Sequence, residues 1–116
     1  MATGIVIEWK KGQAPEKDHI ELELRRYLDG CGSVQWLSST WYANLHGHPN
    51  IEWMTAEEMN GHRFFEVYCG LDAEPRDNPF IEVMVRPVSR DEFTRAVARG
   101  FAELVARTLD GNIRPV

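Results

Sequence analysis

The last third of the chain contains the pattern that most limits its fold. Residues 89–111 read SRDEFTRAVARGFAELVARTLDG, with apolar or small side chains at helical spacing. This spacing predicts an amphipathic helix of about 20 residues. The expected apolar face consists of Phe93, Ala96, Val97, Gly100, Phe101, Leu104, Val105 and Leu109. Such a helix needs a second layer to cover its apolar face, and the rest of the chain must supply that layer.

Both ends of this helix carry recognisable signals. Ser89 and Glu92 have the spacing of a capping box, which predicts Ser89 as the N-cap residue. Gly111 is expected to end the helix. The small residues Ala96 and Gly100 are expected to let the helix approach the sheet closely.

Strand-like segments make up much of the preceding sequence. GIVIEWKK (residues 4–11) alternates apolar and polar side chains, as a strand with one buried face does. Residues 33–48, rich in Val, Trp, Thr and Tyr, predict one long strand with a bulge near Ser38 and Ser39, and residues 50–54 continue the sheet.

Two further strands are expected in the second half. They are HRFFEVYCGL (residues 62–71) and FIEVMVRPV (residues 80–88), joined as a hairpin by the polar loop 72–79. Residues 55–61 predict a short helical turn between the sheet segments, because Thr55 and Glu58 have capping-box spacing.

Residues 16–30, EKDHIELELRRYLDG, are ambiguous. Ile20, Leu22 and Leu24 alternate as in a strand, whereas a helix would place four residues on one face: Ile20, Leu24, Tyr27 and Leu28. We interpret the segment as a helix, because its acids come early and its two arginines come late, as the helix dipole favours.

These segments together predict one α+β domain that spans residues 1–116. The expected order is β-α-β-β-β-β-α, with one mostly antiparallel sheet of about five strands. Both helices are expected on the same face of this sheet.

The N-terminal sequence MATGIVIEWKKGQ has only three apolar residues in a row before Glu8. We therefore expect neither a signal peptide nor a membrane anchor, and a cytoplasmic protein. Cys31 and Cys69 match no metal or disulfide spacing and are interpreted as buried thiols.

The net charge of −5 is unevenly distributed along the chain. Residues 50–82 contain eight acids and two bases, a surplus of six negative charges. This distribution argues against nucleic acid as a partner, because phosphate binding needs clustered Lys and Arg. It favours a basic protein partner.

The sequence LHGHPNIEW (residues 45–53) is the strongest candidate for a metal site. His46 and His48 would share one face of a strand, and His62 or Glu66 could supply a third ligand. The neighbouring Gly, Pro and Asn favour a turn instead, so no metal and no cofactor are expected. The sequence also lacks a phosphate-binding glycine loop and a nucleophile motif, so we do not expect an enzyme.

The acidic middle of the chain is the candidate partner-binding surface. Its carboxylates would steer a basic partner, and a Trp would supply the anchor contact. The candidate residues are Glu52, Trp53, Glu57, Glu58, Glu66, Asp72, Glu74, Asp77 and Trp41. Glu82 would join Glu66 in this surface if both face outward.

In layout, this chain resembles the immunity proteins of bacterial contact-dependent inhibition and other polymorphic toxin systems. The resemblance covers the whole chain, from GIVIEWKK at its start to FIEVMVRPVSRDEFTRAVARGFAELV near its end. It implies a cytoplasmic protein that binds one cognate toxin, commonly a nuclease, and blocks its active site or its access to substrate. No residue role carries over by position.

Two alternatives stay open from the sequence. One is a small metal-dependent enzyme or metal-binding protein that uses His46 and His48. The other is a chaperone or adaptor domain that binds a different protein partner, for which a homodimer through an exposed sheet edge is one arrangement.

Overall fold

The computed structural model describes residues 4–10, 12–29, 32–37, 39–45, 63–70, 80–89 and 91–115. The elements in chain order are β1 (Ile5–Lys10), α1 (Lys17–Tyr27), β2 (Ser33–Leu37), β3 (Thr40–Asn44), β4 (Phe64–Cys69), β5 (Phe80–Pro87), α3 (Glu92–Thr108) and β6 (Asn112–Pro115). The α+β class predicted from the sequence is confirmed. The expected strand at 50–54 and the helical turn at 55–61 lie outside the described residues.

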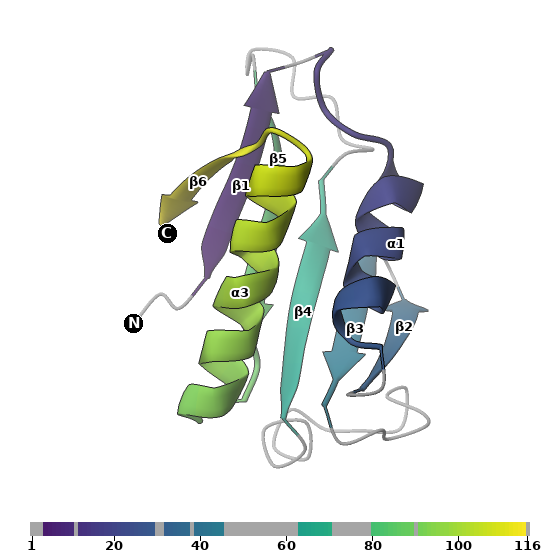
Figure 1. Cartoon of the computed structure of the whole chain (residues 1–116), viewed down its shortest axis with the longest axis vertical. Helices are drawn as coiled ribbons and strands as arrows, with labels where there is room; N and C mark the ends of the chain where they lie inside the picture. Colours follow the sequence, from purple (N-terminus) through teal and green to yellow (C-terminus); the bar gives the residue numbers. More distant parts are fainter. Residues whose placement is uncertain are drawn as a thin grey trace.

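One antiparallel sheet forms the frame of the molecule. Its strand order is β2-β3-β4-β5-β1-β6, and neighbouring strands run in opposite directions throughout. Both helices lie on the same side of this sheet (Figure 1). The predicted hairpin of β4 and β5 is present, with Val67 opposite Val85.

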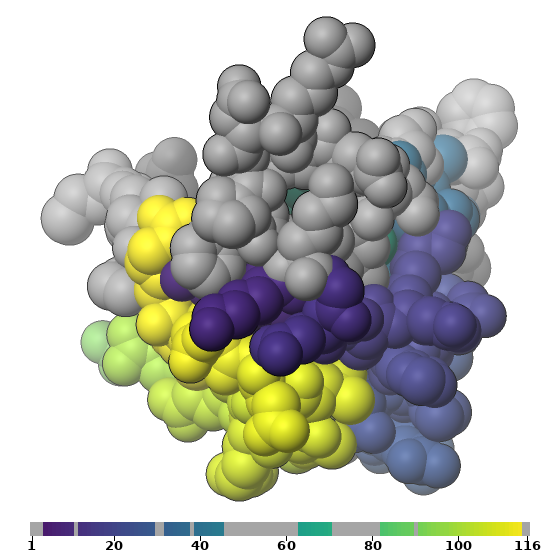
Figure 2. Space-filling view, turned by 90° about the horizontal axis from the view of Figure 1, so that it is seen from above, coloured from purple at the N-terminus to yellow at the C-terminus, as the bar shows by residue number. Residues whose placement is uncertain are grey.

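A sixth strand follows the last helix and was not expected. After α3 the chain returns along β1, where Ile7 faces Ile113 and Val6 faces Arg114. Figure 2 shows the C-terminal segment, in yellow, packed beside the N-terminal segment, in purple. The short sequence NIRP carries no clear alternation, so the pairing with β1 determines this strand rather than its own pattern.

The predicted single strand over 33–48 is wrong. The segment forms a hairpin, in which Trp36 of β2 faces Trp41 of β3 and Leu37 faces Thr40. Only two residues connect the strands, and Ser39 has a φ of 64°, in the left-handed region that such tight hairpin turns require. Ser39, expected in a bulge, therefore lies in the turn, and Ser38 lies outside the described residues.

The hydrophobic core lies between the sheet and the two helices. In each central strand every second residue points into it, as strand geometry requires. The sheet contributes Ile7, Trp9, Trp41, Phe65, Val67, Val83 and Val85, among others. Phe101 of α3 occupies the middle, with its ring centroid 5.7 Å from that of Tyr27 on α1 and 6.3 Å from that of Phe65 on β4.

The buried face of α3 differs from the predicted one. It consists of Thr94, Ala98, Phe101, Ala102 and Val105. Phe93, expected in the core, is 54% exposed, and Ala96 is also exposed. Ala98 and Ala102, rather than Ala96 and Gly100, allow the close approach to the sheet. Two overlapping apolar faces share Phe101 and Val105, so the spacing alone could not distinguish them.

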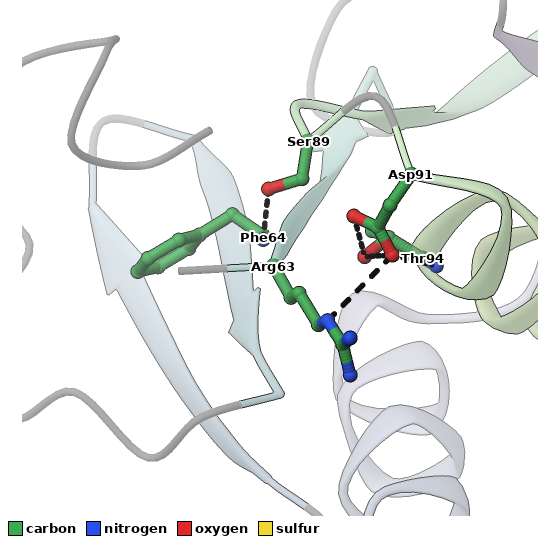
Figure 3. Close-up of polar contacts among 5 residues, drawn as sticks. All are labelled: Arg63, Phe64, Ser89, Asp91 and Thr94. Atoms are coloured by element: carbon green, nitrogen blue, oxygen red, sulfur yellow. Dashed lines mark hydrogen bonds and ion pairs between the residues drawn. The ribbon is translucent and has the colours of Figure 1, made fainter. Parts of the chain in front are cut away.

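The N-cap of α3 is Asp91 and not Ser89. The Thr94 backbone N–H donates to Asp91 Oδ2 at 3.0 Å, and Thr94 Oγ1 donates to Asp91 Oδ1 at 2.8 Å. Ser89 instead accepts a hydrogen bond on its Oγ from the Phe64 backbone N–H, at 2.8 Å. Arg63 Nε lies 3.7 Å from Asp91 Oδ2 (Figure 3). These contacts connect the start of α3 to the start of β4.

Replacing Asp91 by alanine should lower the free energy of unfolding by about 1 kcal/mol at neutral pH, because it removes the cap acceptor. Burial raises the pKa of the Asp91 carboxyl. The hydrogen bonds from Thr94 and the charge of Arg63 together lower the pKa by more than burial raises it, so it lies below its ordinary value of 3.8. A lowered folded-state pKa stabilises the protein fully above the unfolded pKa and loses this effect as pH falls through the folded pKa.

Asp91→Asn is the matched control, since asparagine also accepts cap hydrogen bonds. Urea unfolding should show that the advantage of wild type over Asp91→Asn shrinks from about pH 6 to about pH 2. An advantage that does not change with pH would contradict a stabilising role for the ionised carboxylate.

Candidate binding surface

The face of the sheet opposite to the helices is called the outer sheet face below. Successive side chains of a strand point to opposite faces of the sheet. Residues whose neighbours along a strand point into the core therefore point to the outer sheet face. The described outward residues of interest are Glu8, Tyr42, Glu66, Tyr68, Glu82, Met84, Arg86 and Arg114. The described helices, α1 and α3, lie on the opposite face (Figure 1), so we consider this face a candidate for binding.

Tyr68 lies near the end of a central strand of this face. It belongs to β4, and it faces Thr40 on one side and Met84 on the other. Its side chain is 52% exposed, although β4 has a strand on each side. Phe64, four residues earlier on the same strand and the same face, is fully buried. Tyr68 therefore exposes its ring where Phe64, on the same strand and face, does not.

An ion pair lies beside Tyr68. Glu66 and Arg86 face one another across β4 and β5, and their side chains are in contact. Glu66 thus faces outward, as the acidic-surface hypothesis required, but only 16% of its side chain is exposed. Its negative charge is balanced by the guanidinium of Arg86, whose side chain is 54% exposed.

A second ion cluster lies on the other side of the same face. Glu8 and Glu82 face one another across β1 and β5. Arg114 of β6 reaches both, with its Nε 3.5 Å from Glu8 Oε2 and one terminal nitrogen 2.6 Å from Glu82 Oε1. Because one guanidinium serves two carboxylates, this cluster keeps one excess negative charge.

Trp41 does not belong to the binding surface, which corrects the sequence hypothesis. It is 1% exposed and part of the core. Its indole N–H donates to Glu21 Oε1 at 2.8 Å, and its ring centroid lies 4.7 Å from that of Trp36. Trp41 is therefore too buried to contact a partner.

The other predicted surface residues lie outside the described part of the chain. These are Glu52, Trp53, Glu57, Glu58, Asp72, Glu74 and Asp77. The candidate metal ligands His46, His48 and His62 also lie outside it, as does Cys31. Among the described residues, no group of three or more His, Cys, Asp or Glu side chains is arranged to hold a metal. Cys69 is buried, as expected.

The sequence interpretation missed Tyr68, Met84, Arg86 and Arg114. The alternation of β4 contains a signal for Tyr68, because Phe65, Val67 and Cys69 point inward and Tyr68 must then point outward. No local signal could find Arg114, since it reaches the face only through β6.

No family model, curated protein or solved structure matches this chain. None of the described helices is long and apolar enough to cross a membrane.

Proposed function

We propose that this chain is a non-catalytic protein inhibitor of the immunity-protein kind, which binds one basic toxin domain through the outer sheet face. The observation that carries the proposal is the 52% exposure of Tyr68 on a strand that has a neighbouring strand on each side. Aromatic side chains with few rotatable bonds are favoured anchors of protein interfaces. Met84 beside it adds adaptable apolar surface.

Charge supports a basic partner. Residues 50–82 carry eight acids and two bases, and two of these acids, Glu66 and Glu82, face outward near Tyr68. The cluster of Glu8, Glu82 and Arg114 has one carboxylate more than it has guanidinium groups. Lys or Arg side chains of a partner would find acceptors there, and the acidic segment would speed their approach.

The proposed mechanism has two steps. Long-range attraction first orients a basic cleft, such as one that binds phosphates, against the outer sheet face. Tyr68 is then buried in the cleft and excludes the substrate. The first step is screened over about 8 Å at physiological ionic strength, so association should slow as salt rises.

Tyr68→Ala should weaken binding of the partner about 30-fold or more, as expected for an aromatic anchor worth about 2 kcal/mol. The matched control is Phe93→Ala, which removes an aromatic side chain of similar exposure, 54%, from the helical side. Tagged wild type and both variants would be used to capture proteins from the source organism, followed by titration of the purified partner.

The expected result is one basic protein, bound in equal amounts by wild type and Phe93→Ala and lost by Tyr68→Ala. Its toxic activity should disappear at one equivalent of wild-type chain. Equal binding by both variants would overturn the role of the outer sheet face. A bound partner whose activity is unchanged would overturn the inhibitor proposal.

A further inference from the structure

The two edges of the sheet differ in their protection. In the described sheet the edge strands are β2 and β6, which lie on opposite sides in Figure 1. β6 has four residues and includes Arg114 and Pro115, a charge and a residue without an N–H. β2, Ser33–Leu37, reads SVQWL and has neither charge nor proline. Charges and prolines commonly protect the edges of natural sheets, and β2 carries neither, so β2 is the better candidate of the two for pairing with another strand.

Hydrogen bonds between β3 and β4 reveal which way each backbone group of β3 points. The Cys69 N–H donates to the Ser39 carbonyl at 3.1 Å, and the Leu45 N–H donates to the Arg63 carbonyl at 3.1 Å. In an antiparallel pair such bonds recur at every second residue. The odd-numbered residues from 39 to 45 therefore bond to β4, and the even-numbered residues bond to β2.

The same alternation continues into β2. The even-numbered residues of β3 face Ser33, Gln35 and Leu37. These three residues consequently turn their backbone groups toward β3. The N–H and C=O groups of the two residues between them, Val34 and Trp36, point away from the sheet. Four backbone groups thus line what is called the β2 edge below.

We propose that the β2 edge binds the β2 edge of a second copy of this chain, in antiparallel orientation, with Gln35 at the two-fold axis. In this register Val34 lies opposite Trp36 of the second copy. All four outward groups of each strand then pair, which gives four hydrogen bonds across the axis. If the register shifted by two residues, some of these N–H and C=O groups would lie opposite residues outside Ser33–Leu37. Gly32 would be one such residue in one of the two shifts, and its N–H already donates to the Leu28 carbonyl.

The side chains fit the same register. On the helical side, Val34 would pack against Trp36 of the second copy, an apolar pair at each end of the contact. Trp36 is already held by its contact with Trp41 and by Lys17 Nζ, 4.6 Å from its ring centroid. On the outer side, Gln35 would lie opposite Gln35 of the second copy, a pair of uncharged side chains. β2 has no charged residue, so no like charges oppose one another across the axis.

A charge swap at the axis tests this arrangement. Gln35→Lys and Gln35→Glu each place two like charges opposite one another, so each variant alone should be monomeric. A mixture of the two should form a heterodimer. Sedimentation of wild type from about 1 µM to about 500 µM should show a monomer–dimer equilibrium, and thermal unfolding of each variant would verify that it is folded.

Amide hydrogen exchange gives an independent readout of the same register. The Val34 and Trp36 amides should exchange more slowly as concentration rises, whereas the Ser33, Gln35 and Leu37 amides, which bond to β3, should not change. Val34→Pro removes an outward N–H and should raise the dissociation constant of the dimer about tenfold or more. Arg114→Ala on the opposite edge is the matched control and should leave that constant unchanged.

The outcomes separate this inference from the proposed function. A wild-type chain that stays monomeric over this range, or a mixture of the charged variants that does not associate, would overturn it. Loss of the toxin partner, rather than of the dimer, in Gln35→Lys would assign the β2 edge to that partner instead. Tyr68→Ala should leave the dimer unchanged, so failure of one proposal does not imply failure of the other.

Discussion

Replacing Trp41 by alanine is expected to lower the free energy of unfolding by about 3–5 kcal/mol, a large part of the total stability of a domain of this size. Trp41 is 1% exposed, so its removal leaves a cavity that neighbouring side chains cannot fill completely. The substitution also removes the donor that bonds to Glu21 on α1. Urea denaturation followed by circular dichroism would measure the loss.

Two controls separate packing from hydrogen bonding and from binding. Trp41→Phe keeps an aromatic ring but loses the N–H, and Glu21 is 35% exposed and can bond to water instead. We therefore expect a smaller loss than for alanine, and unchanged partner binding per folded molecule. If Trp41→Phe weakened partner binding as strongly as Tyr68→Ala, the assignment of Trp41 to the core alone would be wrong.

Local alternation in the sequence was enough to predict most strands. In β1, Ile7 and Trp9 enter the core while Glu8 faces outward, as a period of two requires. The same rule located β4 and β5. The spacing of Ile20, Leu22 and Leu24 fits both a helix and a strand. The placement of acids and arginines along the segment was therefore the signal that predicted the helix α1. Leu22 is 46% exposed, as the helical interpretation requires.

The errors arose where contacts distant in sequence decide the structure. The buried face of α3 depends on which residues meet Phe65 and Tyr27, and no local spacing contains that information. Ser89 lost its predicted capping role because its hydroxyl accepts from Phe64, 25 residues earlier. The β6 strand depends on β1, at the opposite end of the chain.

The candidate site shows the same limit. The sequence identified Glu66 and Glu82 as conditional members of an acidic surface, and both face outward. It did not identify the arginines that neutralise them, because Arg86 and Arg114 reach Glu66 and Glu82 only through strand pairing. Charge counted along the chain therefore overestimated the negative charge of this face.

The proposed inhibitor surface and the proposed dimer can coexist. A two-fold axis perpendicular to the sheet keeps both outer sheet faces on the same side. The strand β3 separates the β2 edge from Tyr68 on β4. A dimer would therefore present two Tyr68 side chains in one direction, and a partner with two copies of its basic cleft would bind it more tightly than a monomer.

Replacing Gly111 by valine is expected to lower the free energy of unfolding by about 2–3 kcal/mol, because it overfills a packed region. A Cβ atom at Gly111 would lie 2.6 Å from Ile7 Cγ2 and 2.9 Å from Trp9 Cε2, and both side chains are buried. Trp9 cannot move aside without losing the hydrogen bond from its indole N–H to the Leu109 carbonyl, at 2.9 Å. The glycine expected only to end the helix is thus required by close packing, while the neighbouring Asp110 adopts the left-handed conformation, with a φ of 57°.

The matched control is Gly12→Ala, at a turn where φ is 94° and a Cβ would have no neighbour within 4 Å. This variant should lose only about 1 kcal/mol, from backbone strain alone. Urea denaturation of both variants would compare the two costs directly. An equal loss would mean that Ile7 and Trp9 can move aside for the added side chain without lowering the free energy of unfolding. The contact between the end of α3 and β1 would then be looser than the burial of Trp9 implies, and β6, which starts at the next residue, would not depend on it.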